Sequence, residues 1–114
     1  MLSIKLPIPE KVSTNKVYEG MHWGKRKKLA DLYHTTFLQF KNKFVITSYP
    51  IEMTFIYTFK SRPLDVDNVS FMTKMCIDGM RHIGLLQDDS IDFIQGLDTK
   101  IKRGDKDSIQ IIIV

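Results

Sequence analysis

Short carboxylates cluster in the second half of this 114-residue sequence, in a pattern typical of metal-binding sites. Asp65 and Asp67 belong to the run Asp65-Val66-Asp67-Asn68, and a second pair, Asp88-Asp89, follows farther along the chain. Carboxylates a few ångströms apart cannot all stay ionised unaided, and a hard cation such as Mg²⁺ neutralises them. Within a basic protein, this grouping suggests a metal ion held against a polyanion.

The first pair falls where a strand should end and a helix should begin. Residues 51–60 alternate apolar with polar side chains, which predicts a strand. Apolar residues at helical spacing over residues 69–83 predict a helix that ends near a glycine. If the segment leaving the strand is extended, Asp65 and Asp67 point to the same side, since side chains alternate with period two. The short return after the helix would bring the second carboxylate pair back to them.

The predicted helix also carries charge on the face opposite its apolar stripe. Asp67, Lys74 and Asp78 are separated by seven and four residues, and these offsets return to nearly the same face of a helix. Each feature alone also fits a structural role. Asp67 could cap the helix, Lys74 and Asp78 could form an ordinary ion pair, and Asp88-Asp89 could form a turn. The combination favours the metal site.

Charge is divided unevenly along the chain. Residues 1–60 hold ten basic and four acidic side chains, residues 61–114 hold seven and nine, and the whole chain carries a net charge of +4. This excess favours an anionic partner. The run Lys25-Arg26-Lys27-Lys28 opens a helix predicted to extend to about Lys43, where cations oppose the helix dipole. A phosphate contact explains the run, and a solubilising role is the alternative.

Aromatic side chains accompany basic residues in a segment predicted as an irregular loop up to about Trp23. The runs Ser13–Lys16 and Tyr18–Trp23 combine small polar, basic and aromatic groups, the mixture that phosphate and base contacts use. The alternative is a solvated loop whose Tyr18 and Trp23 pack back onto the core.

Length and composition bound the fold. A chain of 114 residues with 43% hydrophobic side chains fits a single domain, residues 1–114, with a core of ordinary size. The predicted order is strand, long loop, helix, strand, helix, strand, strand. This order predicts an α+β fold, a small mixed β-sheet with two main helices. The apolar run of the last strand, residues 108–114, predicts burial on both of its faces.

The single cysteine and the lack of a targeting signal predict an intracellular protein. The single cysteine, Cys76, cannot form an intramolecular disulfide and is expected in the core. The first residues lack the apolar run of a signal peptide, and no stretch is long enough to span a membrane. We therefore expect a soluble, cytoplasmic protein with no membrane partner. His22, His34 and His82 stand apart, none at metal-ligand spacing.

Several motifs together resemble the RusA-type Holliday-junction resolvases, a family of small dimeric endodeoxyribonucleases common in phages and prophages. The resemblance covers most of the chain. Its parts are Leu6-Pro7-Ile8-Pro9 with Ser13-Thr14-Asn15-Lys16 and Tyr18, then Arg62-Pro63-Leu64-Asp65-Val66-Asp67-Asn68, then Lys74-Met75-Cys76-Ile77-Asp78-Gly79-Met80, and finally Gly84-Leu85-Leu86-Gln87-Asp88-Asp89. Relative to the family's pattern, Val69-Ser70-Phe71 is inserted ahead of the lysine, which places it about one helical turn farther along the axis.

The resemblance implies a RusA-like fold and a homodimer that cleaves branched DNA, such as four-way junctions, with Mg²⁺ or Mn²⁺ in recombination and repair. It assigns catalytic roles to Asp65, Asp67, Lys74 and Asp89, and it places Asp88 with the three aspartates at the metal. The DNA contacts that it implies are Asn15, Lys16, Lys25, Arg26, Lys27, Lys28, Arg62 and Arg81. It also implies phage or prophage origin and the cytoplasm of a bacterial host.

Two other functions stay open from the sequence. A structure-selective nucleic-acid-binding module would use the carboxylates for a structural ion and would bind without metal-dependent cleavage. A nucleotide-handling enzyme would use Asp-x-Asp to bind a metal-phosphate group, although the chain lacks a Gly-rich phosphate loop.

Overall fold

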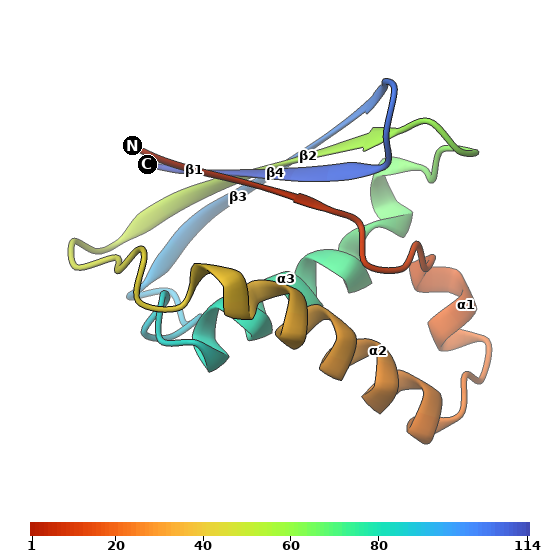
Figure 1. Cartoon of the computed structure of the whole chain (residues 1–114), viewed down its shortest axis with the longest axis horizontal. Helices are drawn as coiled ribbons and strands as arrows, with labels where there is room; N and C mark the ends of the chain where they lie inside the picture. The colour runs from red at the N-terminus through yellow and green to blue at the C-terminus, as the bar shows by residue number, and fades with distance from the viewer.

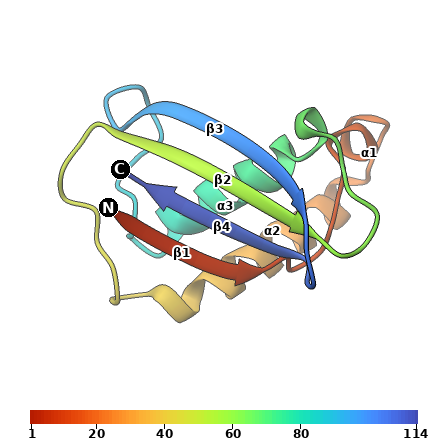
Figure 2. The same cartoon turned by 90° about the horizontal axis from the view of Figure 1, so that it is seen from above.

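Four strands form one mixed sheet. The computed structural model describes residues 1–114, with β1 (Leu2–Pro7), β2 (Ile51–Phe59), β3 (Ile94–Arg103) and β4 (Ser108–Ile113). The strand order is β1-β4-β2-β3 (Figure 2). β4 is antiparallel to both of its neighbours, whereas β2 and β3 are parallel. The two edge strands are therefore β1 and β3.

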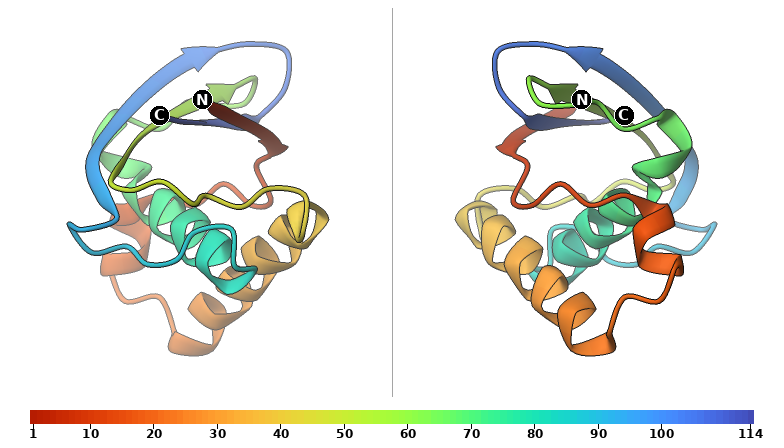
Figure 3. Two further views of the ribbon diagram at one scale, coloured as in Figure 1. Left: turned by 90° about the vertical axis from the view of Figure 1, so that its left-hand side faces the viewer. Right: turned by 90° about the vertical axis from the view of Figure 1, so that its right-hand side faces the viewer.

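The helices cover one face of this sheet, as Figures 1 and 3 show. They are α1 (Thr14–Tyr18), α2 (Trp23–Phe37) and α3 (Ser70–His82), with short 3-10 helices η1 (Leu38–Phe40) and η2 (Val66–Asn68). α3 forms the crossover that parallel strands require, between β2 and β3, and α2 packs against it. The predicted α+β fold with two main helices on a small mixed sheet is confirmed. No helix has both the length and the apolar character needed to cross a bilayer.

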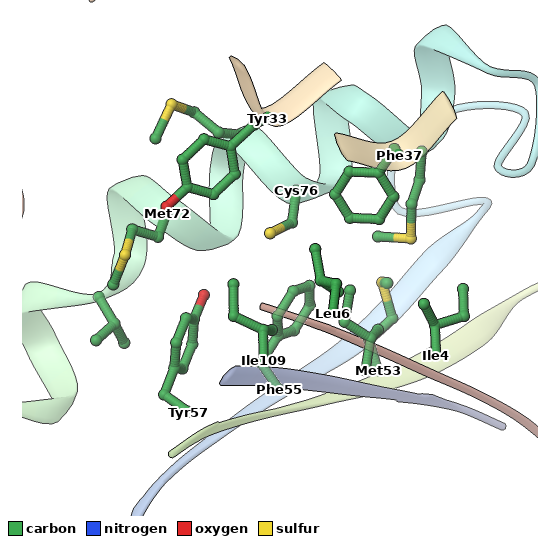
Figure 4. Packing of buried hydrophobic residues seen from close by; sticks show 14 of the residues in the cluster. Ile4, Leu6, Tyr33, Phe37, Met53, Phe55, Tyr57, Met72, Cys76 and Ile109 are labelled. Carbon is green, nitrogen blue, oxygen red and sulfur yellow. The ribbon is translucent and has the colours of Figure 1, made fainter. Parts of the chain in front are cut away.

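One apolar cluster fills the space between sheet and helices (Figure 4). Phe55 and Tyr57 of β2 are fully buried against Met72 and Cys76 of α3. The Tyr57 hydroxyl lies 2.6 Å from Oγ1 of Thr73, so a buried polar pair joins β2 to α3. Burial raises the pKa of the Cys76 thiol, which fits the predicted core cysteine.

α2 and α3 pack tightly against each other at Gly79. A Cβ at this position would lie only 2.8 Å from Cδ2 of Phe37, so the ring fits because glycine has no side chain. In the same contact, the rings of His34 and His82 stack with their centroids 5.0 Å apart. These two histidines stand apart in the sequence, and the packing of the two helices brings their rings together.

Two predicted boundaries in the first half are wrong. The segment expected to be irregular contains α1, which Ser13 caps by accepting a hydrogen bond of 3.2 Å from the N–H of Lys16. The following helix ends at Phe37 rather than near Lys43, and the chain tightens into η1 before Asn42 takes a left-handed φ of 65°.

The last strand is not buried on both faces. Ile109, Ile111 and Ile113 point toward the helices and are buried, whereas the residues between them are only partly covered. The apolar run suggested full burial, but the helices lie on one face of the sheet and leave the other open to solvent (Figure 3).

Candidate functional site

A cavity of about 500 Å³ opens between the amino-terminal segment and the segment that follows β2. Four cations and two carboxylates line it, namely Lys11, Lys16, Lys25, Arg62, Glu10 and Asp65. We call this hollow the basic cavity. The structure thus gathers Lys16, Lys25 and Arg62, which are predicted phosphate contacts, around Asp65, a predicted metal ligand.

Hydrogen bonds between α1 and the start of α3 shape one side of the basic cavity. The N–H of Phe71 donates to the Thr14 hydroxyl oxygen at 3.0 Å, and the N–H of Asn15 donates to Oδ1 of Asn68 at 3.2 Å. Thr14 thus satisfies a helix N–H that has no partner within α3. The predicted DNA contact Asn15 is fixed by its backbone beside the Asp65–Asn68 run.

The segment that carries Arg62 is fixed by an aspartate that no sequence pattern indicated. The Asp107 carboxylate accepts hydrogen bonds from the N–H of Lys60 at 2.8 Å, the N–H of Ser61 at 3.0 Å and the Ser61 hydroxyl at 2.6 Å. Nζ of Lys11 donates to Oγ of Ser61 at 3.1 Å and to the carbonyl oxygen of Arg62 at 2.7 Å. The Ser61 hydroxyl above all, then the backbone N–H donors, hold the pKa of Asp107 below its usual range.

Asp65 and Asp67 do not lie on one extended segment. Asp65 has extended backbone angles, but Val66–Asn68 form η2, so the period-two alternation stops before Asp67. Asp65 lines the basic cavity, and Val66 lines a groove on the other side of η2. Asp67 is also not the cap of α3, because the 3-10 turn places Val69 at the cap position.

The second hollow lies between α3 and β3 and has a volume of about 320 Å³. We call it the α3–β3 groove. Its lining includes the charged residues Lys74, Asp78 and Asp89 and the apolar residues Val66, Ile77, Ile94 and Leu97. Nζ of Lys74 lies 3.5 Å from Oδ2 of Asp78, so the ion pair suggested by their spacing is present.

Arg81 lies among three carboxylates near the end of α3. Its guanidinium nitrogens lie 3.8 Å from Asp78, 3.6 Å from Asp88 and 3.5 Å from Asp89. All these side chains are partly exposed, so the pairs add little stability. They nevertheless place a positive charge beside carboxylates that would otherwise repel one another. Arg81, implied as a DNA contact, therefore also neutralises acidic groups of its own chain.

The four predicted metal carboxylates do not form one cluster within a single copy of the chain. Asp65 and Asp67 precede α3, whereas Asp88 and Asp89 lie beside Arg81 near its other end. Asp89 lines the α3–β3 groove together with Val66 and Ser70, whereas Asp65 lines the basic cavity. No three His, Cys, Asp or Glu side chains are grouped closely enough to hold a metal ion together.

The basic run lies in the first turns of α2, where the sequence placed it. Lys25 lines the basic cavity and, together with Lys28, a further hollow along α2. Arg26 and Lys27 are exposed. His22 caps the helix, since its Nδ1 accepts a hydrogen bond of 3.1 Å from the N–H of Gly24, so the cations themselves take no part in the cap.

Two aromatic side chains flank this basic surface. Tyr18, at the end of α1, is 80% exposed, and Trp23, at the start of α2, is 68% exposed. The alternative in which both rings pack onto the core is therefore wrong. Exposed rings beside cations can stack on unpaired bases.

Comparisons with known proteins do not identify a family. No protein-family model matches the chain, and no curated protein matches its sequence. The case for a function therefore rests on the motifs and on the geometry of the two hollows.

Proposed function

We propose that this protein is a metal-dependent endodeoxyribonuclease that resolves Holliday junctions and related branched DNA by paired phosphodiester hydrolysis. The observation that carries the proposal is the place of Asp65 in the basic cavity, beside Lys16, Lys25 and Arg62. Such cations bind phosphates without reading sequence. A carboxylate among them repels a phosphate unless a divalent cation lies between the two, so the arrangement suits a metal-phosphate contact.

The donor set suits Mg²⁺, or Mn²⁺ in its place. Mg²⁺ takes oxygen ligands, keeps several waters and is usually bound through one or two carboxylates together with substrate phosphates. Asp65 and Asp67 would hold the ion from one end of α3, and Asp89, with Asp88 next to it, completes the set that the resemblance assigns. When bound, the ion supplies polarisation of a phosphoryl oxygen and a water of lowered pKa.

The chain's own cations would do the remaining work. Lys16, Lys25 and Arg62 would orient the phosphodiester, and the ammonium of Lys74 would stabilise charge that develops on the phosphate or the leaving oxygen. The inserted residues 69–71 span the cap and the start of α3, and Lys74 lies one turn into the helix on its exposed face, where it pairs with Asp78. The proposal also includes a homodimer acting in the cytoplasm of a bacterial host, as the resemblance implies.

Cleavage of a labelled four-way junction in Mg²⁺ tests the proposal. Asp65→Asn keeps the size and shape of the side chain but removes its charge and replaces one acceptor oxygen by an amide donor. We expect it to lose more than the roughly 100-fold that loss of an outer-shell group costs at a metal site. The matched control is Asp31→Asn, an exposed position on α2 that lines neither hollow. Equal cleavage by both variants would refute the role of Asp65.

One observation favours a second candidate, a binding module that does not cut. Arg81 already neutralises Asp78, Asp88 and Asp89, as a structural charge cluster would require. In that case the carboxylates hold at most a structural ion, and wild-type protein should shift a four-way junction in a gel without cleaving it in Mg²⁺ or Mn²⁺.

A further inference from the structure

The connection between β3 and β4, residues 104–107, crosses β2, because β2 lies between these two consecutive strands in the sheet. It crosses on the face that the helices leave open, as Figures 1 and 3 show. A Cβ on Gly104 would collide with Cγ2 of Thr58, so the chain can pass this close to β2 only with a glycine. The Asp107 carboxylate holds the end of the crossing through its hydrogen bonds to Lys60 and Ser61. The crossing is therefore fixed on the open face of the sheet.

A hollow of about 360 Å³ lies beside this crossing. We call it the hairpin hollow. No apolar side chain lines it, whereas four cations and one carboxylate do, namely Lys5, Lys102, Arg103, Lys106 and Asp105. A hollow with this lining suits an anion and offers nothing to an apolar ligand.

All four strands bring polar groups to the hairpin hollow. Lys5 alternates with the buried residues of β1, and Thr58 alternates with those of β2, so both side chains point away from the helices. Thr58 is in register with Lys102 on one side and with Ser108 on the other. The two hydroxyl groups of the central strands thus lie between lysines of the two edge strands. Hydroxyl groups and lysines are common donors to phosphate oxygens.

The four cations of the hairpin hollow have no ion-pair partner in the chain. Every ion pair of the protein involves Lys74 or Arg81, and Asp105 pairs with none of the cations beside it. Like charges gathered around one hollow repel one another, and an anion bound among them relieves the repulsion. The hollow differs in this respect from the surroundings of Arg81, where the chain supplies its own counter-charges.

The hairpin hollow is connected to the basic cavity through the Asp107 contact. Lys106 and Ser108 of the hollow flank Asp107, which bonds to Ser61, and Ser61 precedes Arg62 of the basic cavity. Cations therefore continue from one hollow toward the other along the end of the sheet. One turn of duplex DNA is about 34 Å long, comparable with the longest dimension of the molecule, 36 Å. A single duplex arm is long enough to reach both hollows.

We propose that the hairpin hollow binds the phosphate backbone of duplex DNA, beside the phosphates that enter the basic cavity. Its cations contact the phosphates, and the hydroxyl groups of Thr58 and Ser108 donate to phosphate oxygens. Contacts of this kind position a duplex without reading its sequence. The inference deepens the proposed function and rests on it for the choice of DNA as the polyanion, but it requires no cleavage.

Binding measured in EDTA tests the inference apart from cleavage. The slope of log binding constant against log salt concentration, for a labelled linear duplex, changes by about 0.9 for each phosphate contact. Lys5→Gln and Lys102→Gln should each reduce the magnitude of the slope by about 0.9, and the double variant by about 1.8. The matched control Lys41→Gln is exposed and lines neither the basic cavity nor the hairpin hollow, so it should leave the slope unchanged. Circular dichroism checks that each variant is folded.

Lysine acetylation, read by mass spectrometry of peptides, gives a second measurement on the wild-type protein. Bound duplex should slow the acetylation of Lys5, Lys102 and Lys106 and leave that of Lys41 unchanged. Unaltered slopes in the variants, or unprotected lysines in the hollow, would overturn the inference even if the wild-type protein cuts junctions. Reduced slopes without cleavage in Mg²⁺ would overturn the nuclease proposal and uphold this inference.

Anionic vesicles distinguish DNA from a membrane as the partner. The test uses phosphatidylserine–phosphatidylcholine vesicles with the wild-type protein and the double variant. If the double variant loses binding to these vesicles and keeps the wild-type slope for DNA, the hollow binds lipid headgroups and the inference is wrong. We expect the double variant to change the DNA slope instead.

Discussion

The hydroxyl of Ser61 donates a hydrogen bond of 2.6 Å to Oδ2 of Asp107, which joins the end of β2 to the hairpin before β4. Ser61 directly precedes Arg62, so this bond fixes where the chain leaves the sheet on its way into the basic cavity. Because Lys11 also bonds to Ser61, three separate segments meet at this point. The position of the cavity's cations therefore depends on a residue outside the cavity.

Asp107 should make stability depend on pH in the acid range. Its pKa is lower in the folded chain than in the unfolded chain. It therefore stabilises the fold above the unfolded value near 3.9, and this contribution is lost as pH falls through the folded value. Asp107→Asn should lower the free energy of unfolding at pH 7, and the difference from wild type should shrink at pH 3. Urea unfolding at pH 7 and at pH 3 measures this difference in the free energy of unfolding. The control Asp31→Asn should show no such pH dependence.

The close contact at Gly79 should make alanine destabilising in the middle of a helix. Alanine is favoured over glycine by up to about 1 kcal/mol in a helix. Overpacking against Phe37 costs about 1–3 kcal/mol, so we expect a net loss of about 1 kcal/mol for Gly79→Ala. In the Phe37→Leu background the smaller side chain relieves the clash, and Gly79→Ala should then be neutral or stabilising. Thermal or chemical unfolding of the four proteins tests the coupling, which additive effects would disprove.

Lys25 should contact a phosphate in the DNA complex. Each such contact contributes about 0.9 to the slope of log binding constant against log salt concentration. Lys25→Gln should therefore weaken binding to a four-way junction and reduce the magnitude of that slope by about 1. Lys41→Gln, exposed beyond the other end of α2, is the control and should leave the slope unchanged. A slope unaffected by Lys25→Gln would remove this residue from the interface.

Mixed dimers should reveal whether the metal site is shared between copies. Asp65→Asn and Asp89→Asn should each be inactive alone. If Asp65 of one copy acts with Asp89 of the other, a mixed dimer keeps one intact site and should nick one strand of a junction without making the paired cut. If both residues act within one chain, the mixture has no intact site. Denaturing gels of the labelled strands distinguish the two results.

Much of the scaffold could be predicted from sequence periodicity. Alternation over residues 51–60 predicted β2, and the apolar stripe predicted α3 up to Gly84, whose φ of 79° and N–H bond to Arg81 end the helix. These elements bury one face each, so their periods follow directly from the packing. The burial of β4 was predicted wrongly. Its continuous apolar run could not show that the helices cover only one face of the sheet.

The candidate site was less predictable, because it depends on contacts between distant segments. The resemblance and the charge pattern named Asp65, Lys16, Lys25 and Arg62 as site residues, and the structure shows that these four line one cavity, while their roles stay predictions. The 3-10 helix η2 could not be predicted from the sequence, because a three-residue 3-10 helix leaves no periodic pattern. Asp107 was missed for a related reason, since only the register of β4 against β2 shows that it faces Ser61.

The most direct test of the nuclease proposal compares a labelled four-way junction with a linear duplex of the same sequence, each incubated with wild-type protein in Mg²⁺ or in EDTA. The account predicts paired nicks in opposed strands of the junction, present in Mg²⁺, absent in EDTA and absent from the duplex. Junction binding with no cleavage in either Mg²⁺ or Mn²⁺ would contradict it and would establish a binding module in place of an enzyme.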